Sequence, residues 1–270
     1  VCGVCLDWQY VQLRAVWHSG MGGCCAAGRY YDSCRYDKKA FYGQRKIKMI
    51  LFHTDLDNTL IYSYKHDIGI AKQCVELYKE REISYITDVT YTLLKEMKEH
   101  VTIVPTTTRT VGQYNRIDLG VGAFRYALAC NGGVLLADGK EDMDWYAGSL
   151  AMVSESKDTL AYGEELLKKD PNRCMEIRNI QGLFTFTKSE KPLDSVNMLK
   201  QAVNTDQVDI FHNGIKVYIV PKKLTKGAAL LRLKKRLKAE TIIAAGDSEF
   251  DISMINSADF GLAPLALKGN

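Results

Sequence analysis

Residues Met49–Thr59 read MILFHTDLDNT, and the rest of the chain is organised around this stretch. An apolar run leads into two carboxylates, Asp55 and Asp57, separated by one residue. In an extended strand, side chains at i and i+2 share a face, so both carboxylates are expected to project together while Leu56 turns toward the core. Two crowded carboxylates repel unless a cation or a shared proton holds them. The pattern predicts a Mg²⁺-dependent phosphoryl-transfer site, with a solvated strand end as the alternative.

The composition is that of a soluble globular protein. The chain has 270 residues, 46% hydrophobic and 25% charged, which suits one large domain or two moderate ones. A net charge of +4 is too small to favour nucleic acid, and no stretch approaches the roughly 20 apolar residues needed to span a bilayer. Isolated cysteines behind the motif are typical of a reducing compartment. We therefore expect a cytoplasmic protein without nucleic-acid or membrane partners, whose oligomeric state the sequence leaves open.

Residues 1–48 differ from everything that follows. They are rich in Cys, Gly, Tyr and Arg and show no sustained helical or strand period. Their cysteines lack the second paired spacing of a zinc site. We interpret the segment as a non-native or disordered extension, with the natural start at Met49. The chain also stops soon after its last predicted strand, near Phe260–Ala263, so we expect a truncated C-terminus.

Four apolar runs end in polar residues. Because ligands bind at the carboxyl edge of parallel sheets, we expect these side chains to meet there. Lys226, at the start of a helix that Thr225 can cap, adds a positive charge beside a helix N-terminus. The runs are Ile50–Phe52, His100–Val104, Tyr126–Cys130 and Thr241–Ala245, and the polar residues after them are Asp55 and Asp57, Thr107, Asn131, and Asp247 with Asp251.

Hydrophobic periodicity predicts three helices around these strands. One covers Asp67–Glu80. A second runs from Asp88 to about Glu99, and a third from Thr225 to about Leu237. The inner faces are predicted to be Val89, Leu93 and Met97 in the second helix and Leu230, Leu233 and Leu237 in the third. A basic run in the third helix (Arg232, Lys234, Lys235, Arg236, Lys238) is expected to be a solvated face rather than a nucleic-acid site.

The region from about Leu136 to Val220 changes character. Turn signals at Asp138-Gly139, Gln181-Gly182 and Asn213-Gly214 separate short alternating runs. Two helical patterns, Ser149–Lys169 and Leu193–Val203, lie among them. This is typical of an antiparallel α+β unit inserted as a second domain. Its cations Arg173, Arg178, Lys188 and Lys216 are expected either to meet a second anionic group on a substrate or to be ordinary exposed charges.

With these motifs in place, the chain resembles the haloacid dehalogenase-like superfamily, in the branch of Cof-type and sucrose-phosphate-phosphatase-like enzymes. The resemblance rests on DLDNT, TTTR, LTKG and GDSEFDISM in this order, with Asn131-Gly132-Gly133 before the insertion. It implies a Rossmann-like doubly wound parallel sheet core, from residues 49–135 and 222–270. It also implies an α+β cap of type IIB, residues 136–221.

The resemblance also implies a role for each motif residue. Asp55 would be the nucleophile that forms an aspartyl-phosphate, and Asp57 the general acid and base. The phosphate-binding residues would be Thr107, Thr108, Asn131 and Lys226, and Mg²⁺ would be held by Asp55, Asp57, Asp247 and Asp251. The implied activity is Mg²⁺-dependent hydrolysis of a small phosphorylated metabolite, expected to be a sugar phosphate. A phosphomutase and a non-catalytic sugar-phosphate sensor are the alternatives; a receiver module would lack the Asp-x-Asp pair and the cap.

Two positions depart from the family pattern. Thr108 stands where the second motif commonly has glycine, so Thr106 competes with Thr107 for the phosphate. Phe250 stands where Cof-like relatives commonly have asparagine, which removes one polar group near the metal. Arg109 is expected to orient the loop or contact substrate, and His53 to be packed rather than catalytic.

Overall fold

The structure, a computed structural model, describes residues 49–265 and 267. These residues belong to one compact unit. The interpretation of residues 1–48 lies outside the described residues.

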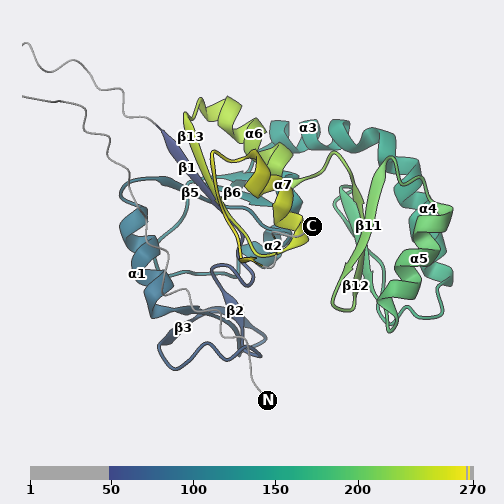
Figure 1. The fold of residues 1–270 in the computed structure, drawn as a ribbon, viewed down its shortest axis with the longest axis horizontal. Helices are drawn as coiled ribbons and strands as arrows, with labels where there is room; N and C mark the ends of the chain where they lie inside the picture. The colour runs from purple at the N-terminus through teal and green to yellow at the C-terminus, as the bar shows by residue number, and fades with distance from the viewer. Residues whose placement is uncertain (1–48, 266, 268–270) are drawn as a thin grey trace, which may run out of the picture. The chain divides into compact units, whose positions relative to one another are not determined.

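A parallel sheet forms the core, with strand order β14-β13-β1-β5 (Figure 1). A parallel bridge between Thr106 and Leu128 continues it to the next strand along, β6. The central position of β1 places the residue after it between the ends of two neighbouring strands, which is where a doubly wound sheet binds ligands. The strands are β1 (Ile50–Thr54), β5 (Thr102–Pro105), β6 (Tyr126–Ala129), β13 (Thr241–Ala245) and β14 (Phe260–Leu262).

Both faces of this sheet are covered. Successive side chains of β1 point in opposite directions, so Leu51 packs with Leu233 of α6 while Phe52 packs with Leu94 of α1. The prediction of a doubly wound α/β core is therefore confirmed. The helices of this part are α1 (Asp88–Met97), α2 (Val111–Tyr114), α3 (Met143–Val153), α6 (Lys226–Leu237) and α7 (Glu249–Ser257).

The predicted helix over Asp67–Glu80 is wrong. The segment holds β3 (Lys72–Tyr78), which pairs antiparallel with β4 (Arg81–Thr87); β2 (Tyr62–Ser63) pairs on the other side of β4. Register shifts in β3 break the strict alternation of a strand, which is why its apolar residues mimic a helical period.

The predicted helix is confirmed as α1, but its predicted inner face is right only at Met97, which packs against the core. Leu94 is buried and Tyr91 packs beside it, whereas Val89 and Leu93 are exposed. Two apolar stripes compete in this helix, and contact with Ile103 and Ile86 selects the one through Leu94.

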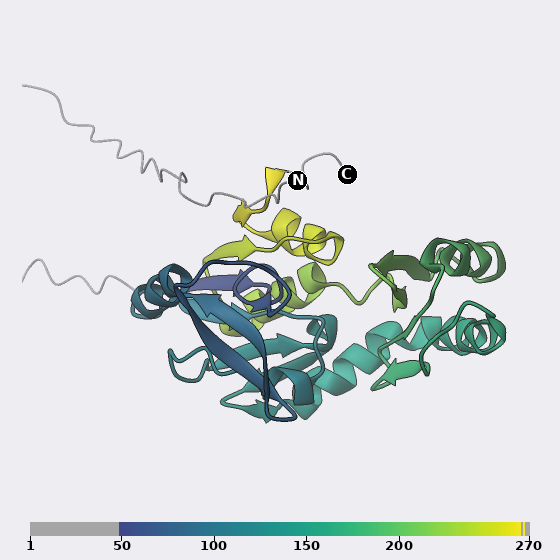
Figure 2. The same cartoon turned by 90° about the horizontal axis from the view of Figure 1, so that it is seen from below.

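The inserted region forms its own antiparallel sheet, of order β11-β12-β10-β9. The turns at Gln181-Gly182 and Asn213-Gly214 join these strands as predicted. The helical pattern at Ser149–Lys169 divides into α3 and α4, with a 3₁₀ turn between them. Figures 1 and 2 show α4 and α5 together on one side of this sheet. The elements are α4 (Lys157–Lys169), β9 (Arg178–Ile180), β10 (Phe184–Lys188), α5 (Pro192–Ala202), β11 (Val208–Asn213) and β12 (Lys216–Pro221).

A small antiparallel sheet connects the two regions. It consists of β6, β7 (Val134–Ala137) and β8 (Lys140–Glu141), with the predicted turn at Asp138-Gly139 between the last two. The predicted helix N-cap at Thr225 is confirmed, because the side chain of Thr225 accepts a hydrogen bond from the backbone N–H of Ala228. In the described part of the chain, no helix combines the length and the apolar character needed to cross a membrane.

Candidate active site

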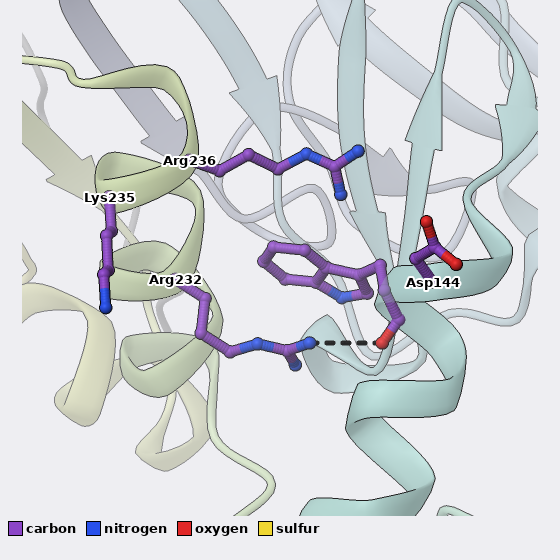
Figure 3. Close-up of a pocket in the computed structure, with 5 residues that line it drawn as sticks. Asp144, Arg232, Lys235 and Arg236 are labelled. Atoms are coloured by element: carbon purple, nitrogen blue, oxygen red, sulfur yellow. Dashed lines mark hydrogen bonds between the residues drawn. The ribbon is translucent and has the colours of Figure 1, made fainter.

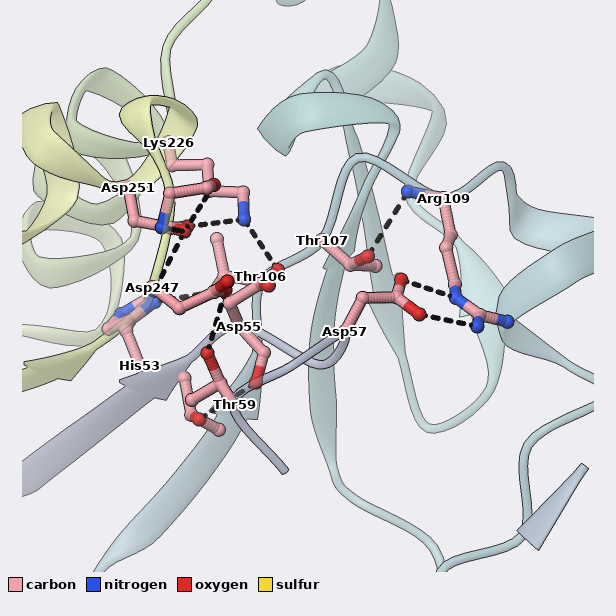
Figure 4. A network of polar contacts seen from close by, with 12 residues as sticks. His53, Asp55, Asp57, Thr59, Thr106, Thr107, Arg109, Lys226, Asp247 and Asp251 are labelled. Atoms are coloured by element: carbon pink, nitrogen blue, oxygen red, sulfur yellow. Dashed lines mark hydrogen bonds and ion pairs between the residues drawn. The ribbon is translucent and has the colours of Figure 1, made fainter. Parts of the chain in front are cut away.

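Asp55 follows the central strand directly, and its backbone N–H donates to the carbonyl of Ala245 at 2.9 Å. Its carboxylate is buried, and the ammonium of Lys226 lies 2.6 Å from Oδ1 (Figure 4). Burial raises the pKa of Asp55, and Lys226 acts to lower it. The ammonium is thus the group that favours an ionised carboxylate at this buried position.

Lys226 is the first residue of α6, and its side chain is only 1% exposed. It also contacts Oδ1 of Asp251 at 2.6 Å. Burial acts to lower the pKa of Lys226, but Asp55 and Asp251 outweigh burial and raise it. Lys226 is therefore a fixed cation that joins a strand end to α7.

Contact between the backbones of two helices fixes the position of Lys226. A Cβ added at Gly227 would lie 2.3 Å from the carbonyl oxygen of Ser253 in α7. The absence of a side chain at residue 227 lets α6 approach α7 closely enough for Lys226 to meet Asp251.

Asp251 has most of its hydrogen-bonding capacity in use. Its Oδ2 accepts from the backbone N–H groups of Asp247 and Ser248, at 3.2 and 3.0 Å, and from the hydroxyl of Ser248 at 2.7 Å. Because Oδ1 faces Lys226, this carboxylate mainly holds the loop before α7 and the lysine in place.

Asp247 completes an acidic group. One carboxylate oxygen from each of Asp55, Asp247 and Asp251 lies within 4.8 Å of the others. Thr59 donates to Asp247 at 3.2 Å. Burial, and then Asp251, raise the pKa of Asp247. Crowded carboxylates of this kind supply the hard oxygen ligands that divalent cations prefer, so the group can hold a divalent metal.

The carboxylate of Asp57 faces Arg109 and not the acidic group. Arg109 donates to both of its carboxylate oxygens, from Nε and Nη2, each at 2.7 Å. Asp57 is not a member of the acidic group, although Leu56 is fully buried as predicted. The strand ends at Thr54, so the alternation expected to align Asp55 with Asp57 no longer holds beyond it. Figure 4 shows Asp57 turned toward Arg109.

A buried glutamate anchors Arg109. Glu76 of β3 accepts from Nη1 of Arg109 at 2.8 Å, from Arg116 at 3.0 Å and from the hydroxyl of Ser84 at 2.7 Å. Sequence reasoning missed Glu76 because the segment was predicted to be helical. The network fixes the guanidinium, and through it the carboxylate of Asp57.

The two threonines in the second motif differ in surroundings. The hydroxyl of Thr106 donates to the carbonyl of Val104 and contacts Nδ1 of His53 at 3.0 Å. Thr107 Oγ1 accepts from the backbone N–H of Arg109 at 3.1 Å, which leaves its own hydroxyl hydrogen available. Of the two hydroxyls, that of Thr106 is therefore already engaged, whereas that of Thr107 still has its hydrogen to donate. His53 is packed as expected, and burial lowers its pKa to about 3.

The remaining predicted phosphate-binding residues lie on the adjacent loops. Asn131 is buried, with φ of 58°, and its amide donates to the carbonyl of Leu224 at 2.8 Å. This bond supports the segment that leads into Thr225 and Lys226. Thr108 is half-buried beside Thr107.

A separate pocket lies between α3 and α6 and shares no residue with the acidic group (Figure 3). Arg232 lies 3.9 Å from the ring of Trp145 and donates to its carbonyl, and Arg236 pairs with Asp142. Lys234 pairs with Asp259. These cations fasten α6 to its neighbours, which agrees with the interpretation of the basic run as a helix face.

Comparison with known proteins shows a similarity to one family. A model of haloacid dehalogenase-like hydrolases matches residues 140–263. Over these residues, which hold the third and fourth motifs, the chain is similar to haloacid dehalogenase-like hydrolases. It is 26% identical to a phosphoglycolate phosphatase of Methanothrix thermoacetophila over 181 residues. This alignment covers 66% of this chain and 75% of that protein. The family predicted from the four motifs is thus confirmed, and with it the class of enzyme, a hydrolase.

Solved structures share the fold of this chain. The sucrose-phosphatase of Synechocystis sp. PCC6803 aligns with a TM-score of 0.55 at 15% identity, covering 82% of this chain and 85% of that one. The IMP-nucleotidase of Plasmodium falciparum aligns with a TM-score of 0.53 at 14% identity, covering 81% of this chain and 64% of that one. At this identity the likeness shows the fold and leaves the substrate open.

Proposed function

We propose that this chain is a Mg²⁺-dependent phosphatase that hydrolyses a small phosphorylated metabolite, a sugar phosphate in the first instance, through an aspartyl-phosphate. The buried pair of Asp55 and Lys226 at the end of the central strand carries the proposal. A carboxylate next to a fixed cation, beside two further carboxylates, is suited to attack a phosphate monoester.

The reaction has two steps. An oxygen of Asp55 bonds to phosphorus as the ester P–O bond breaks, and Asp57 gives its proton to the departing alcohol oxygen. Water then attacks the phosphorus, Asp57 takes a proton from it, and the bond to Asp55 breaks to release inorganic phosphate. Lys226 offsets the negative charge, and Thr107 donates to a phosphoryl oxygen.

The acidic group fits Mg²⁺ by the chemistry of its donors. Asp55 and Asp247 are the carboxylates with oxygen atoms to spare, whereas Asp251 already binds Lys226 and the loop before α7. We assign the ion to Asp55 and Asp247, supported by Asp251, with the backbone carbonyl of Asp57 as a further ligand. When bound, the ion supplies positive charge that draws the phosphate toward Asp55.

We also propose that residues 136–221 act as a cap over the core formed by residues 49–135 and 222–270. In the structure, Phe211 and Tyr218 of the inserted sheet contact Phe250 of α7, at ring distances of 4.6 and 5.2 Å. Phe250, the departure from the family's asparagine, thus has a packing role beside Asp247 and Asp251.

Phosphate release tests the proposed activity. With a panel of phosphorylated sugars and small metabolites, turnover is expected with Mg²⁺ and should fall at least about 100-fold with EDTA, then return on adding Mg²⁺. Turnover that persists in EDTA would contradict the metal assignment. Isomerisation of a sugar phosphate without net phosphate release would favour a phosphomutase.

Replacing Arg109 tests the positioning of Asp57. Arg109→Gln frees the carboxylate that must protonate the leaving group, so kcat for alkyl phosphates should fall about 10- to 100-fold. 4-Nitrophenyl phosphate has a leaving group that needs little protonation, so its kcat should change less than about threefold. Steady-state kinetics on both substrates measures the difference.

Arg116→Gln is the matched control. Arg116 also binds Glu76 but not Asp57, so its loss should affect both substrates equally. Arg109→Lys should restore part of the alkyl-phosphate rate. An equal loss on both substrates in Arg109→Gln would assign Arg109 a structural role only.

A further inference from the structure

One face of the inserted sheet is basic and aromatic. Strand register places Arg178, Phe186, Tyr218 and Phe211 side by side in one row across β9, β10, β12 and β11. Two residues along, Lys188 of β10 lies opposite Lys216 of β12. Because side chains at i and i+2 share a face, the three cations and three rings belong to the same surface.

This face is turned toward the core. The opposite face, which includes Val217 and Ile219, packs against α4 and α5. On the basic face, Tyr218 and Phe211 contact Phe250, the residue before Asp251 of the acidic group. Burial lowers the pKa of Lys216 and raises that of Tyr218, and the charge of Asp57 acts to raise both. Lys216 therefore lies within electrostatic reach of Asp57.

Among the residues that the structure describes, none forms an ion pair with either lysine of this pair. Like charges placed directly opposite on neighbouring strands repel. Within residues 49–265, no ion pair is formed by Lys188 or Lys216, and Lys216 instead lies 6.0 Å from the ring of Phe186. Arg178 pairs with the exposed Glu176 at 3.2 Å. Burial lowers the pKa of Lys216, and so do Lys188, Arg109 and Arg178.

Arg173, the fourth cation predicted in this region, does not join them. Its backbone forms an antiparallel β-bridge with Ser189. The side chain of Ser189 packs against Ser195 on the helix side of the sheet, so the side chain of Arg173 lies on that side too. Its Nη1 donates to the carbonyl of Met175. Three cations, rather than four, thus gather on the surface turned toward the core.

We propose that Lys188 and Lys216, with Arg178, form a subsite for a second anionic group of the substrate. The proposal rests on the proposed phosphatase function and narrows it. The preferred substrate is a phosphate ester whose alcohol carries a carboxylate or a second phosphate, such as a phosphorylated sugar acid. The phosphate that is cleaved meets Asp55, and the second anion meets the lysines.

Matched substrate pairs test this directly. 3-Phosphoglycerate and glycerol 3-phosphate differ only in a carboxylate in place of a hydroxymethyl group, as do phosphoglycolate and 2-hydroxyethyl phosphate. Glucose 1,6-bisphosphate and glucose 6-phosphate differ in a second phosphate. The anionic member should have a kcat/KM at least about 10-fold higher in one or more pairs. The pair with the largest ratio of kcat/KM values shows whether the subsite prefers a carboxylate or a second phosphate.

Two variants locate the effect. Lys216→Met and Lys188→Met should remove most of the preference within a pair. They should change kcat/KM for the member without the second anionic group by less than about threefold. Lys200→Met removes the same charge from α5, on the far side of the sheet, and should leave the preference intact. Equal rates for both members of every pair, or equal losses on both in the lysine variants, would overturn the subsite.

Binding separates this inference from the proposed chemistry. Calorimetric titration of Asp55→Asn with both members of each pair measures the subsite without turnover. Tighter binding of the anionic member, lost in the double variant with Lys216→Met, supports the subsite even where no phosphate is released by the unmodified protein. Equal affinity within all pairs overturns it whatever the activity.

Discussion

Asp55→Asn should lower phosphate release by at least about 1,000-fold while the protein stays folded. The amide keeps the size of the side chain and can still accept from Lys226, which retains Asp251 as its anionic partner. The variant loses the nucleophilic oxygen but only one of the lysine's two carboxylates. Its melting temperature should therefore fall far less than its activity.

Acid quenching with ³²P-labelled substrate identifies the residue that is phosphorylated. The unmodified protein should yield a labelled aspartyl-phosphate, and Asp55→Asn should yield none. Asp57→Asn is the matched control: with 4-nitrophenyl phosphate it should still become labelled, because Asp55 is intact and the leaving group needs no acid. Label that survives in Asp55→Asn would place the nucleophile elsewhere.

Lys226→Met should reduce both activity and stability. Without the ammonium, Asp55 and Asp251 become two buried carboxylates with no counter-charge, a change that costs roughly 3–5 kcal/mol. For a chain of this size the melting temperature should fall by about 10 °C. Turnover should fall at least about 100-fold, because no fixed cation offsets the charge on nucleophile and phosphate.

A double-mutant cycle isolates the cause of the instability. Combining Lys226→Met with Asp55→Asn removes one of the stranded charges, so the double variant should be more stable than Lys226→Met alone. Thermal unfolding followed by circular dichroism gives the free energies. Strict additivity of the two changes would show that the lysine stabilises the fold through its packing rather than its charge.

The sequence predicted the strand-end residues well because the rule behind them is general. Asp55, Thr107 and Asp247 each follow a parallel strand, and parallel strands deliver their carboxyl ends to one edge. Lys226 was found for a similar reason, since Thr225 marks the start of its helix. Each of these signals lies in a short stretch of sequence and does not depend on contacts with distant residues.

Other features had no local signal. The hairpin between β3 and β4 turns at Lys79-Glu80, both with positive φ, a conformation usually marked by Asn or Gly. Because neither residue is a typical turn residue, the sequence pattern predicted a helix across this segment. The contact of Glu76 with Arg109 joins residues 33 positions apart, so neither it nor the direction of Asp57 was open to pattern reasoning.

Gly227 carries no functional group, yet the alignment of the charged residues depends on it. The lysine and its carboxylate partner stand on different helices, and only hydrogen at position 227 lets those helices touch. A single methyl group there would push the ammonium away from both acids without altering any of the three. The proposed reaction therefore depends on Gly227 as well as on the charged residues, although this glycine takes no part in the chemistry.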